Sequence, residues 1–228
     1  MNFAGIADIG HCKDDPVLAG SVNIMGTINV LKAAADHKLK RFLFASSAYV
    51  YSQYGSVYKN TKQACELFID TFQKDFGLDY TIIRYGSLYG SRSDERNSIY
   101  RIIRQALSEK KISYKGTGDE IREYIHVVDA ARLTVDIMQG PFLNQHIVLT
   151  GNQTMRYGDL LTMIREMLNN DVEIEYLPKD NPDHYEITPY SFSPKLGRKL
   201  VNNPHIDMGQ GLLEIMESVY REMNGPHI

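Results

Sequence analysis

The chain has 228 residues, 43% of them hydrophobic and 23% charged, so it is long enough to bury a substantial core. Its formal net charge of −3 gives no case for nucleic acid or an anionic membrane as a partner. The two cysteines lack metal-ligand spacing, which suits a reducing cytosol and offers no metal site. No apolar run approaches the ~20 residues of a membrane span, and no signal-peptide pattern is present. We therefore expect a cytoplasmic protein.

The first two predicted elements are a short strand and a long helix. Met1–Ala7 reads as a strand that runs into a turn, where Gly5 lets the backbone approach a ligand or simply makes a tight turn. Asp14–His37 is predicted to be helical, because Pro16 suits a first helical turn and apolar residues follow at helical spacing. Those apolar residues are Val22, Met25, Ile28, Leu31 and Ala35.

A buried strand and a second helix follow, joined by a loop rich in Gly, Ser and Tyr. The strand is Arg41–Ala45, and Ser47 comes just after its carboxyl end. The helix carries Tyr58 and Lys62 four residues apart, so these two side chains share one face. Its apolar residues at helical spacing are Ala64, Leu67, Phe68 and Phe72. Because ligands of open α/β sheets bind beyond the carboxyl ends of the strands, we expect Ser47 to face the Tyr/Lys pair.

These three side chains suit the removal of a proton from an alcohol. A tyrosine is a poor base at neutral pH, but a nearby ammonium such as that of Lys62 favours the phenolate and lowers the pKa of Tyr58. Ser47 would hold the reacting oxygen by a hydrogen bond. With 15 tyrosines present, a Tyr-x-x-x-Lys spacing is expected about once by chance, so the spacing alone is a weak signal. The Ser-Ser pair after an apolar strand strengthens it.

The rest of the chain alternates strands and helices, which predicts an α/β fold. Further strands are predicted at Tyr80–Tyr85, His146–Leu149 and, as an edge strand, Val172–Tyr176. Further helices are predicted at Ser98–Glu109, Val127–Met138, Tyr157–Leu168 and Gly209–Met223. Lys111–Val128 is predicted to be a hairpin that turns at Gly116–Gly118. Pro178–Pro194 reads as an irregular loop able to close over a substrate.

Six short motifs, in this order, resemble those of the extended short-chain dehydrogenase/reductases, the NAD-dependent epimerase/dehydratase family that acts on nucleotide sugars. They are NFAG at 2–5, VNIMGT at 22–27, FLFASSAYVYS at 42–52, YKNTK at 58–62, IRYGSLYG at 83–90 and GTGDEIREYIHV at 116–127. The resemblance implies a Rossmann-type doubly wound parallel sheet with a smaller α+β substrate-binding portion. Residues 1–110, with the strand and helix near 127–150, would form the C-terminal half of the NAD-binding domain. Residues 111–228 would form the substrate-binding portion.

The resemblance also implies roles for individual residues. Ser47, Tyr58 and Lys62 would be catalytic. The cofactor-binding residues would be Phe3, Ala4, Gly5, Asn23, Tyr58, Lys62, Tyr85 and Gly86. The substrate-binding residues would be Ser87, Asn97, Tyr114 and Arg122. A guanidinium suits the diphosphate of a sugar nucleotide because its planar fork binds phosphate oxygens bidentately, although a surface salt bridge is the alternative role for Arg122.

One expected part is absent from the sequence. No glycine-rich turn of the kind that holds a dinucleotide pyrophosphate precedes Ser47, so we expect a truncated sheet without its first three strands. For the same reason we expect weak NAD binding and little turnover by this chain. The sequence does not distinguish NAD from NADP.

The function that the resemblance implies is an NAD-dependent nucleotide-sugar epimerase, 4-epimerase-like, with a nucleotide-diphosphate sugar as substrate and a homodimer as its assembly. Ala48-Tyr49 follow Ser47 where dehydratases carry Asp-Glu, so an epimerase or a keto-reductase is favoured over a dehydratase. Ser87 stands where the family commonly has an asparagine, which leaves the sugar open. Two other classes stay open: a non-catalytic remnant, and an interaction subunit whose sheet edge pairs with another chain.

Overall fold

The computed structural model describes residues 1–151 and 154–178, all within the compact unit Met1–Ser193. The strands are β1 (Phe42–Ser47), β2 (Tyr80–Tyr85), β3 (Ser87–Tyr89), β4 (Lys111–Lys115), β5 (Ile121–His126), β6 (Gln145–Leu149), β7 (Thr154–Arg156) and β8 (Glu173–Leu177). The helices are α1 (Ile9–Asp14), α2 (Pro16–Ala19), α3 (Gly26–Asp36), α4 (Ser56–Phe76), α5 (Ser98–Glu109), α6 (Val127–Gln139) and α7 (Tyr157–Met167). A π-helical turn, η1 (Gly20–Met25), joins α2 to α3, and a 3₁₀ turn, η2 (Ala48–Tyr51), follows β1. The predicted loop beyond Pro178 and the predicted helix Gly209–Met223 lie outside the described residues.

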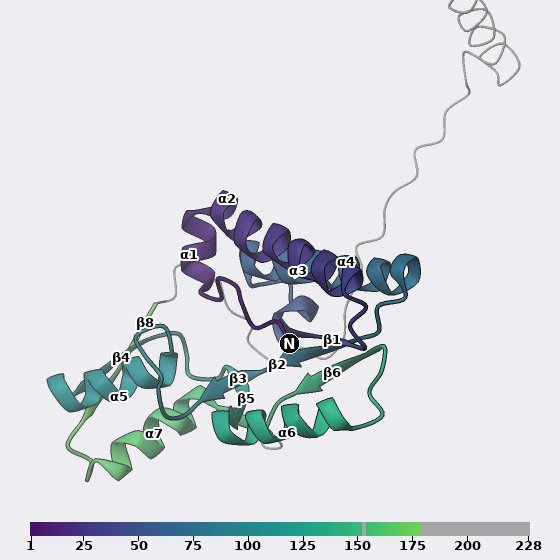
Figure 1. Ribbon diagram of the computed structural model, residues 1–228. Helices are drawn as coiled ribbons and strands as arrows, with labels where there is room; N and C mark the ends of the chain where they lie inside the picture. The colour runs from purple at the N-terminus through teal and green to yellow at the C-terminus, as the bar shows by residue number, and fades with distance from the viewer. Residues whose placement is uncertain (152–153, 179–228) are drawn as a thin grey trace, which may run out of the picture. The chain divides into compact units, whose positions relative to one another are not determined.

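A parallel sheet with the strand order β1-β2-β6 forms the centre of this unit (Figure 1). In its register Ser47 lies opposite Tyr85, and Tyr85 lies opposite Leu149, so the carboxyl ends of all three strands meet at one edge. Asn2 adds a parallel bridge to Phe44 on the free side of β1. The predicted N-terminal strand is therefore present as one bridge beside β1.

Helices cover both faces of this sheet. Leu31 of α3 and Ile69 of α4 pack with Phe44 on one face, whereas Ile137 of α6 packs with Leu43 on the other. Leu43 and Phe44 are neighbours in β1, and successive side chains of a strand point to opposite faces. Figure 1 shows α3 and α4 on one side of the strands and α6 on the other. This layering confirms the predicted Rossmann-type α/β fold.

The helical run Pro16–Asp36 is 21 residues long and, by length and composition alone, is apolar enough to cross a membrane. The expectation that no segment reaches that length was therefore wrong. The run nevertheless packs as a helix of the α/β layer, because its buried residues include Asn23 and Thr27 as well as Leu31. Asn23 Nδ2 donates a hydrogen bond to Thr61 Oγ1 of α4 at 3.0 Å. Polar groups paired with a neighbouring helix are typical of a packed helix, since they satisfy each other on burial.

The two long helices before β2 were predicted correctly, but the apolar residues that predicted them do not all face the core. Met25 is 53% exposed, and Leu67 and Phe68 are 68% and 39% exposed. In their place the buried face of α4 includes Thr61 and Lys62. The buried face of α4 is therefore partly polar, which hydrophobic periodicity alone does not reveal.

The predicted hairpin at Lys111–Val128 is wrong, although both of its strands exist. β4 pairs in parallel with β8, and the N–H of Gly116 donates to the carbonyl of Leu177 at 3.0 Å. β5 pairs in parallel with β3 and antiparallel with β7. The two strands separate after Gly116 because each pairs with a strand that is distant in the sequence.

A separate core joins α5, β4, α7 and β8 through Ala106, Ile112 and Leu161. The predicted division at residue 110 stays a prediction.

Candidate active site

Lys62 lies on the buried face of α4, against the carboxyl end of β1. Its ammonium donates a hydrogen bond to the carbonyl of Ala45 at 2.8 Å and lies 5.9 Å from the centre of the Tyr58 ring. Burial lowers the pKa of Lys62, whereas its electrostatic interactions with Cys65 and Glu66 act in the opposite direction. The predicted Tyr/Lys pair therefore shares one buried environment.

Tyr49 links Ser47 to Tyr58. The N–H of Tyr49 donates to Ser47 Oγ at 3.3 Å, which caps the 3₁₀ turn after β1. The rings of Tyr49 and Tyr58 lie edge to face with their centres 6.3 Å apart. Gly55, with φ of +95°, starts α4 close to Tyr49, where an added Cβ would lie 2.7 Å from Cδ1 of that ring. Because Ser47 Oγ acts as an acceptor in this contact, its own hydrogen can point to a substrate oxygen.

Asn23, in the π-helical turn, binds the backbone of the N-terminal segment that passes close to Lys62. Its side-chain amide accepts from the N–H of Ile6 at 2.7 Å and donates to the carbonyl of Ile6 at 3.0 Å and to Thr61. A Cβ at Gly5 would lie 2.9 Å from Asn23 Oδ1 and 3.8 Å from Lys62 Nζ. The backbone therefore passes close to the ammonium at a residue without a side chain. Asn23 positions this turn in the structure, and its contact with a cofactor stays a prediction.

The other predicted cofactor residues lie at the ends of the N-terminal strand and of β2. The ring of Phe3 is 59% exposed and lies 6.2 Å from the ring of Tyr85. The Tyr85 hydroxyl shares a 2.7 Å hydrogen bond with Thr134 Oγ1 of α6. Ala4 is exposed, and its N–H donates to Asn2 Oδ1 at 3.1 Å. These residues converge on the edge where the strands of the central sheet end.

Gly86 follows Tyr85, and a Cβ there would lie 2.5 Å from Cγ2 of Thr150. We expect Gly86→Ala to lower the free energy of unfolding by about 1–3 kcal/mol, because a β-branched side chain cannot retreat easily from an added methyl group. Gly26→Ala is the matched control, since a Cβ at Gly26 meets nothing within 4 Å. Gly26 lies in a helix, so we expect Gly26→Ala to raise the free energy of unfolding by about 0.5–1 kcal/mol. Urea titrations of both variants check this, and equal stabilities would contradict it.

Ser87 and Asn97 are two of the predicted substrate residues. Leu88 connects them, because it follows Ser87 in the chain and its carbonyl accepts a hydrogen bond from Asn97. Ser87 begins β3. Asn97 caps α5: its Oδ1 accepts from the N–H of Ile99 at 3.0 Å and of Tyr100 at 3.2 Å, and its Nδ2 donates to the carbonyl of Leu88 at 2.9 Å. An open hollow of about 810 Å³ lies between this loop and α6, and Asn97 alone of the predicted site residues lines it. The cap occupies the Asn97 amide, so its contact with a substrate stays a prediction.

Tyr114 and Arg122, the other two predicted substrate residues, lie on β4 and β5. The Tyr114 ring stacks on Tyr157 with centres 4.3 Å apart and planes at 15°, so one ring face is covered. Arg122 is 8% exposed, and its Nη1 donates to the carbonyl of Ile121 at 3.0 Å. Burial raises the pKa of Tyr114, and the charge of Glu120 adds to the shift. The ring of Tyr176 also packs edge to face with Tyr114, with centres 6.2 Å apart, so the contact of Tyr114 with a nucleobase stays a prediction.

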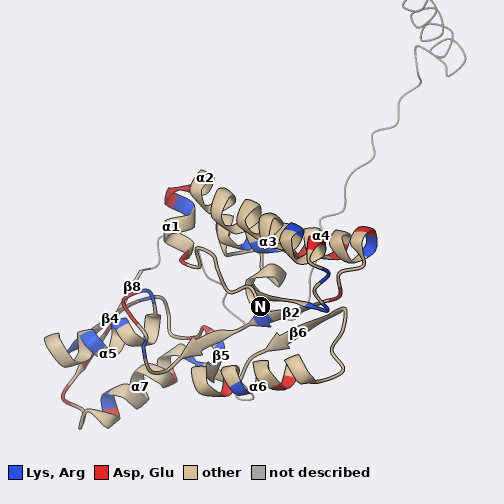
Figure 2. Cartoon of the chain, in the orientation of Figure 1, with Lys and Arg blue, Asp and Glu red and all other residues tan. Residues whose placement is uncertain are grey.

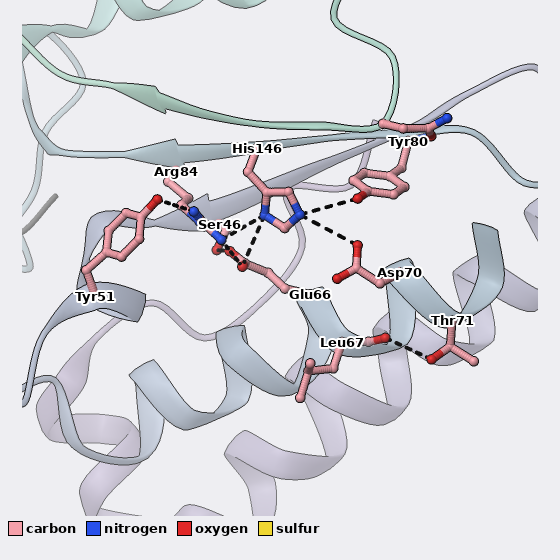
Figure 3. Close-up of polar contacts among 10 residues, drawn as sticks. Ser46, Tyr51, Glu66, Leu67, Asp70, Thr71, Tyr80, Arg84 and His146 are labelled. Carbon is pink, nitrogen blue, oxygen red and sulfur yellow. Dashed lines mark hydrogen bonds and ion pairs between the residues drawn. The ribbon is translucent and has the colours of Figure 1, made fainter. Parts of the chain in front are cut away.

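The sequence analysis missed a buried polar network that ties α4 to the sheet (Figure 3). Glu66 accepts from Ser46 Oγ at 2.5 Å and from Arg84 Nη2 at 2.6 Å. Arg84 also lies 2.7 Å from His146 Nδ1 and contacts the hydroxyl of Tyr51. Two signals could have revealed it: Glu66 is four residues after Lys62, and Arg84 interrupts an otherwise apolar strand.

The residues around Lys62 fit the nicotinamide end of a dinucleotide. Within residues 1–151 and 154–178, the Ala45 carbonyl is the one hydrogen-bond acceptor of its ammonium, although a buried ammonium carries three donors. The remaining donors can hold ribose hydroxyls, and Gly5 leaves the approach free of a side chain. No cluster of metal-ligating side chains is found in the described part of the chain.

A parallel sheet with helices on both faces, and with Ser, Tyr and Lys where β1 ends, defines a Rossmann-type protein of the short-chain dehydrogenase/reductase class. The model of the NAD dependent epimerase/dehydratase family matches residues 1–149. The chain belongs to this family, as its motifs predicted, and the family uses NAD.

Relatives and solved structures agree with this assignment. The chain is 26% identical over 227 residues to a UDP-glucuronate 4-epimerase of Thermodesulfobacterium geofontis, covering 93% of this chain and 69% of that protein. It is 24% identical to a putative UDP-glucose 4-epimerase of Methanocaldococcus jannaschii, covering 95% of this chain and 75% of that protein. The fold is similar to that of UDP-N-acetylglucosamine 4-epimerase from Methanobrevibacter ruminantium, with a TM-score of 0.76 and 23% identity over 84% of this chain and 66% of that one. The chain thus spans about two thirds of the length of these proteins.

Proposed function

We propose that the protein acts as an NAD-dependent epimerase of nucleotide sugars, of the 4-epimerase type. The observation that carries this proposal is the buried Lys62 ammonium, 5.9 Å from the Tyr58 ring and beside the strand end that bears Ser47. The names of the related proteins support the same chemistry.

In the proposed reaction, Tyr58 as phenolate takes the proton of a sugar hydroxyl while the carbon that bears it loses a hydride. NAD, when bound, would supply hydride transfer from and to this carbon. Ser47 donates a hydrogen bond to the same oxygen and fixes its position. Lys62 stabilises the phenolate by its charge and holds the nicotinamide ribose with its remaining donors. When the hydride returns, Tyr58 gives the proton back to the oxygen, so the net change is inversion at one carbon.

The proposed substrate is a nucleotide-diphosphate sugar. Arg122 would bind the diphosphate, Tyr114 the nucleobase, and Ser87 and Asn97 the sugar. Ala48-Tyr49 after Ser47 offer no acid–base pair for elimination of water, which favours epimerisation over dehydration. A keto-reductase uses the same three residues and is the first alternative.

A panel of UDP-, GDP-, dTDP- and CDP-sugars incubated with the protein and NAD tests the proposed function. With NAD in large excess, which offsets the weak binding expected of this chain, we expect one nucleotide sugar to give its 4-epimer slowly, and proton NMR identifies the product. Product formed only when a reduced nicotinamide is supplied would favour the keto-reductase. No turnover with any sugar would favour the non-catalytic remnant or the interaction subunit.

The 228 residues contain no glycine-rich turn before Ser47 to hold a pyrophosphate. We therefore expect this chain to bind NAD more weakly than micromolar, because the contacts around Lys62 serve the nicotinamide ribose alone. Isothermal titration calorimetry measures the affinity, and Lys62→Met, which loses the ribose contact, is the comparison. Micromolar binding by the 228-residue chain would contradict this prediction.

The predicted homodimer and cytoplasmic location also remain proposals. Exposed apolar side chains on neighbouring helices support the dimer: Met25 precedes α3, and Leu67 and Phe68 lie on α4. Sedimentation equilibrium measures the mass in solution, and a monomer at all concentrations would remove the dimer from the proposal.

A further inference from the structure

The carboxylate of Glu66 is held on both oxygens. Oε1 accepts from Ser46 Oγ at 2.5 Å and from Arg84 Nε at 3.0 Å, and Oε2 accepts from Arg84 Nη2 at 2.6 Å. The Glu66 side chain is 9% exposed and that of Arg84 12%. Figure 3 shows these side chains meeting between α4 and the strands. Such a bidentate pair fixes the position of the carboxylate closely.

The same two elements are joined at Lys62. Lys62 and Glu66 are four residues apart on the buried face of α4, and their partners Ala45 and Ser46 are consecutive residues of β1. Consecutive strand residues point to opposite faces, but the carbonyl of one and the side chain of the next can both reach the same helix. α4 is thereby fastened to the end of β1 at two adjacent points, one turn from Tyr58.

We propose that Glu66 is a positioning residue for Lys62: held by Arg84 and Ser46, it fixes the position of α4 at the end of β1 and so holds the Lys62 ammonium beside Tyr58. This inference rests on the proposed function for its catalytic consequence. The electrostatic coupling of Glu66 to Lys62 can be tested without any measurement of turnover.

The charges around Lys62 support this role. The groups around the ammonium come from several elements: α1 brings Cys12, α4 brings Tyr58, Cys65 and Glu66, and β1 brings the Ala45 carbonyl and, 4.8 Å away, the Phe44 ring. The N-terminal segment adds only the backbone at Gly5, which brings no titratable group. Burial lowers the pKa of Lys62, and the charge of Glu66 is among the effects that raise it again.

Glu66 itself is ionised at neutral pH. Burial would raise the pKa of Glu66, but hydrogen bonds from His146, Arg84 and Ser46 outweigh this and hold it below its ordinary value. Burial raises the pKa of both Cys12 and Cys65, so these thiols are neutral at neutral pH. Among the groups named above, Glu66 is therefore the one that carries a negative charge at neutral pH.

Competitive labelling of lysine amines with acetic anhydride over a range of pH, read out by mass spectrometry, tests the proposal on the whole chain. In Glu66→Gln we expect the titration midpoint of Lys62 to move to lower pH, so that its reactivity at a fixed pH below that midpoint rises severalfold. Glu66→Asp keeps the charge one methylene farther away and should fall between the wild type and Glu66→Gln. Asp75→Asn, which removes an exposed carboxylate near the end of α4, is the matched control and should leave Lys62 unchanged.

The folded state of each variant is checked by circular dichroism before labelling. A folded Glu66→Gln with the wild-type midpoint of Lys62 overturns the proposal. If Glu66→Gln does not fold, Glu66→Asp decides, and an unchanged midpoint in that variant has the same meaning.

The labelling result separates this inference from the proposed function. If no sugar is turned over but the Lys62 midpoint moves as expected, the proposed function fails and the coupling stands. Where turnover is measured, Glu66→Gln should also move the alkaline limb of the kcat/KM profile to lower pH, because Lys62 loses its proton earlier. A lower rate with an unmoved profile would show a merely structural role for Glu66 and overturn the proposal.

Discussion

Tyr58→Phe is expected to abolish epimerisation, with a loss of about 10²–10⁴-fold in kcat, because the variant has no group to take and return the hydroxyl proton. The ring itself is retained, so its packing with Ile9, Cys12 and Ala19 should survive. NAD affinity should stay within about twofold of the wild type, since Lys62, the proposed ribose contact, is unchanged and one lost hydroxyl contributes little to binding. A nucleotide-sugar assay with NMR detection measures the first effect, and calorimetry with NAD measures the second.

Tyr54→Phe is the matched control for this experiment. Tyr54 lies in the loop between β1 and α4, and its N–H donates to Ser52 Oγ at 2.9 Å, a backbone contact that the substitution retains. We expect wild-type turnover in this variant. Activity retained in Tyr58→Phe would remove Tyr58 from the proposed mechanism, whatever the behaviour of Tyr54→Phe.

Arg84→Met is expected to lower the free energy of unfolding by about 3 kcal/mol, because it leaves the buried carboxylate of Glu66 without its cation. Lys32→Met is the matched control: Lys32 forms an ion pair with Asp36 at 2.8 Å, but the two side chains are 67% and 58% exposed. Solvent screens such a pair, so its loss should cost less than about 1 kcal/mol. Urea denaturation of the three proteins at neutral pH gives both values. Equal losses in the two variants would show that burial does not strengthen the Arg84–Glu66 pair.

The same pair predicts a dependence of stability on pH. The pKa of Glu66 is lower in the folded protein than its ordinary value, so its contribution is fully present above the unfolded pKa of about 4.3. That contribution is lost as the pH falls through the folded pKa, when the carboxylate takes up a proton. The stability difference between wild type and Arg84→Met should therefore shrink as the pH is lowered below about 4. A difference that stays constant down to acid unfolding would contradict this assignment.

Several elements of the fold followed from local sequence patterns. β2 and α5 have the bounds predicted for them, since Tyr80–Tyr85 is dense in β-forming residues and Ser98–Glu109 carries a clear apolar stripe. The hairpin at Lys111–Val128 could not be rejected in the same way. The partner of β4 is β8, about sixty residues later, and no local pattern reports such a pairing.

The candidate site divides in the same manner. Ser47, Tyr58 and Lys62 could be predicted from the sequence because a hydroxyl at a strand end and a Tyr/Lys pair one turn apart are local patterns, and their catalytic role stays a prediction. The Ser46–Glu66–Arg84 network was not, because its members come from two strands and a helix and become partners only on packing.

By itself the sequence determined the class of fold, the family and the three residues of the proposed chemistry, since strand alternation, helical spacing and short motifs act within a few residues. Only the tertiary structure decided which face of α4 is buried. Hydrophobicity favoured Leu67 and Phe68, yet the structure buries Lys62 and Glu66. Burying a charge is unfavourable unless partners are in place, and those partners, Ala45, Ser46 and Arg84, are supplied by neighbouring strands of the folded sheet.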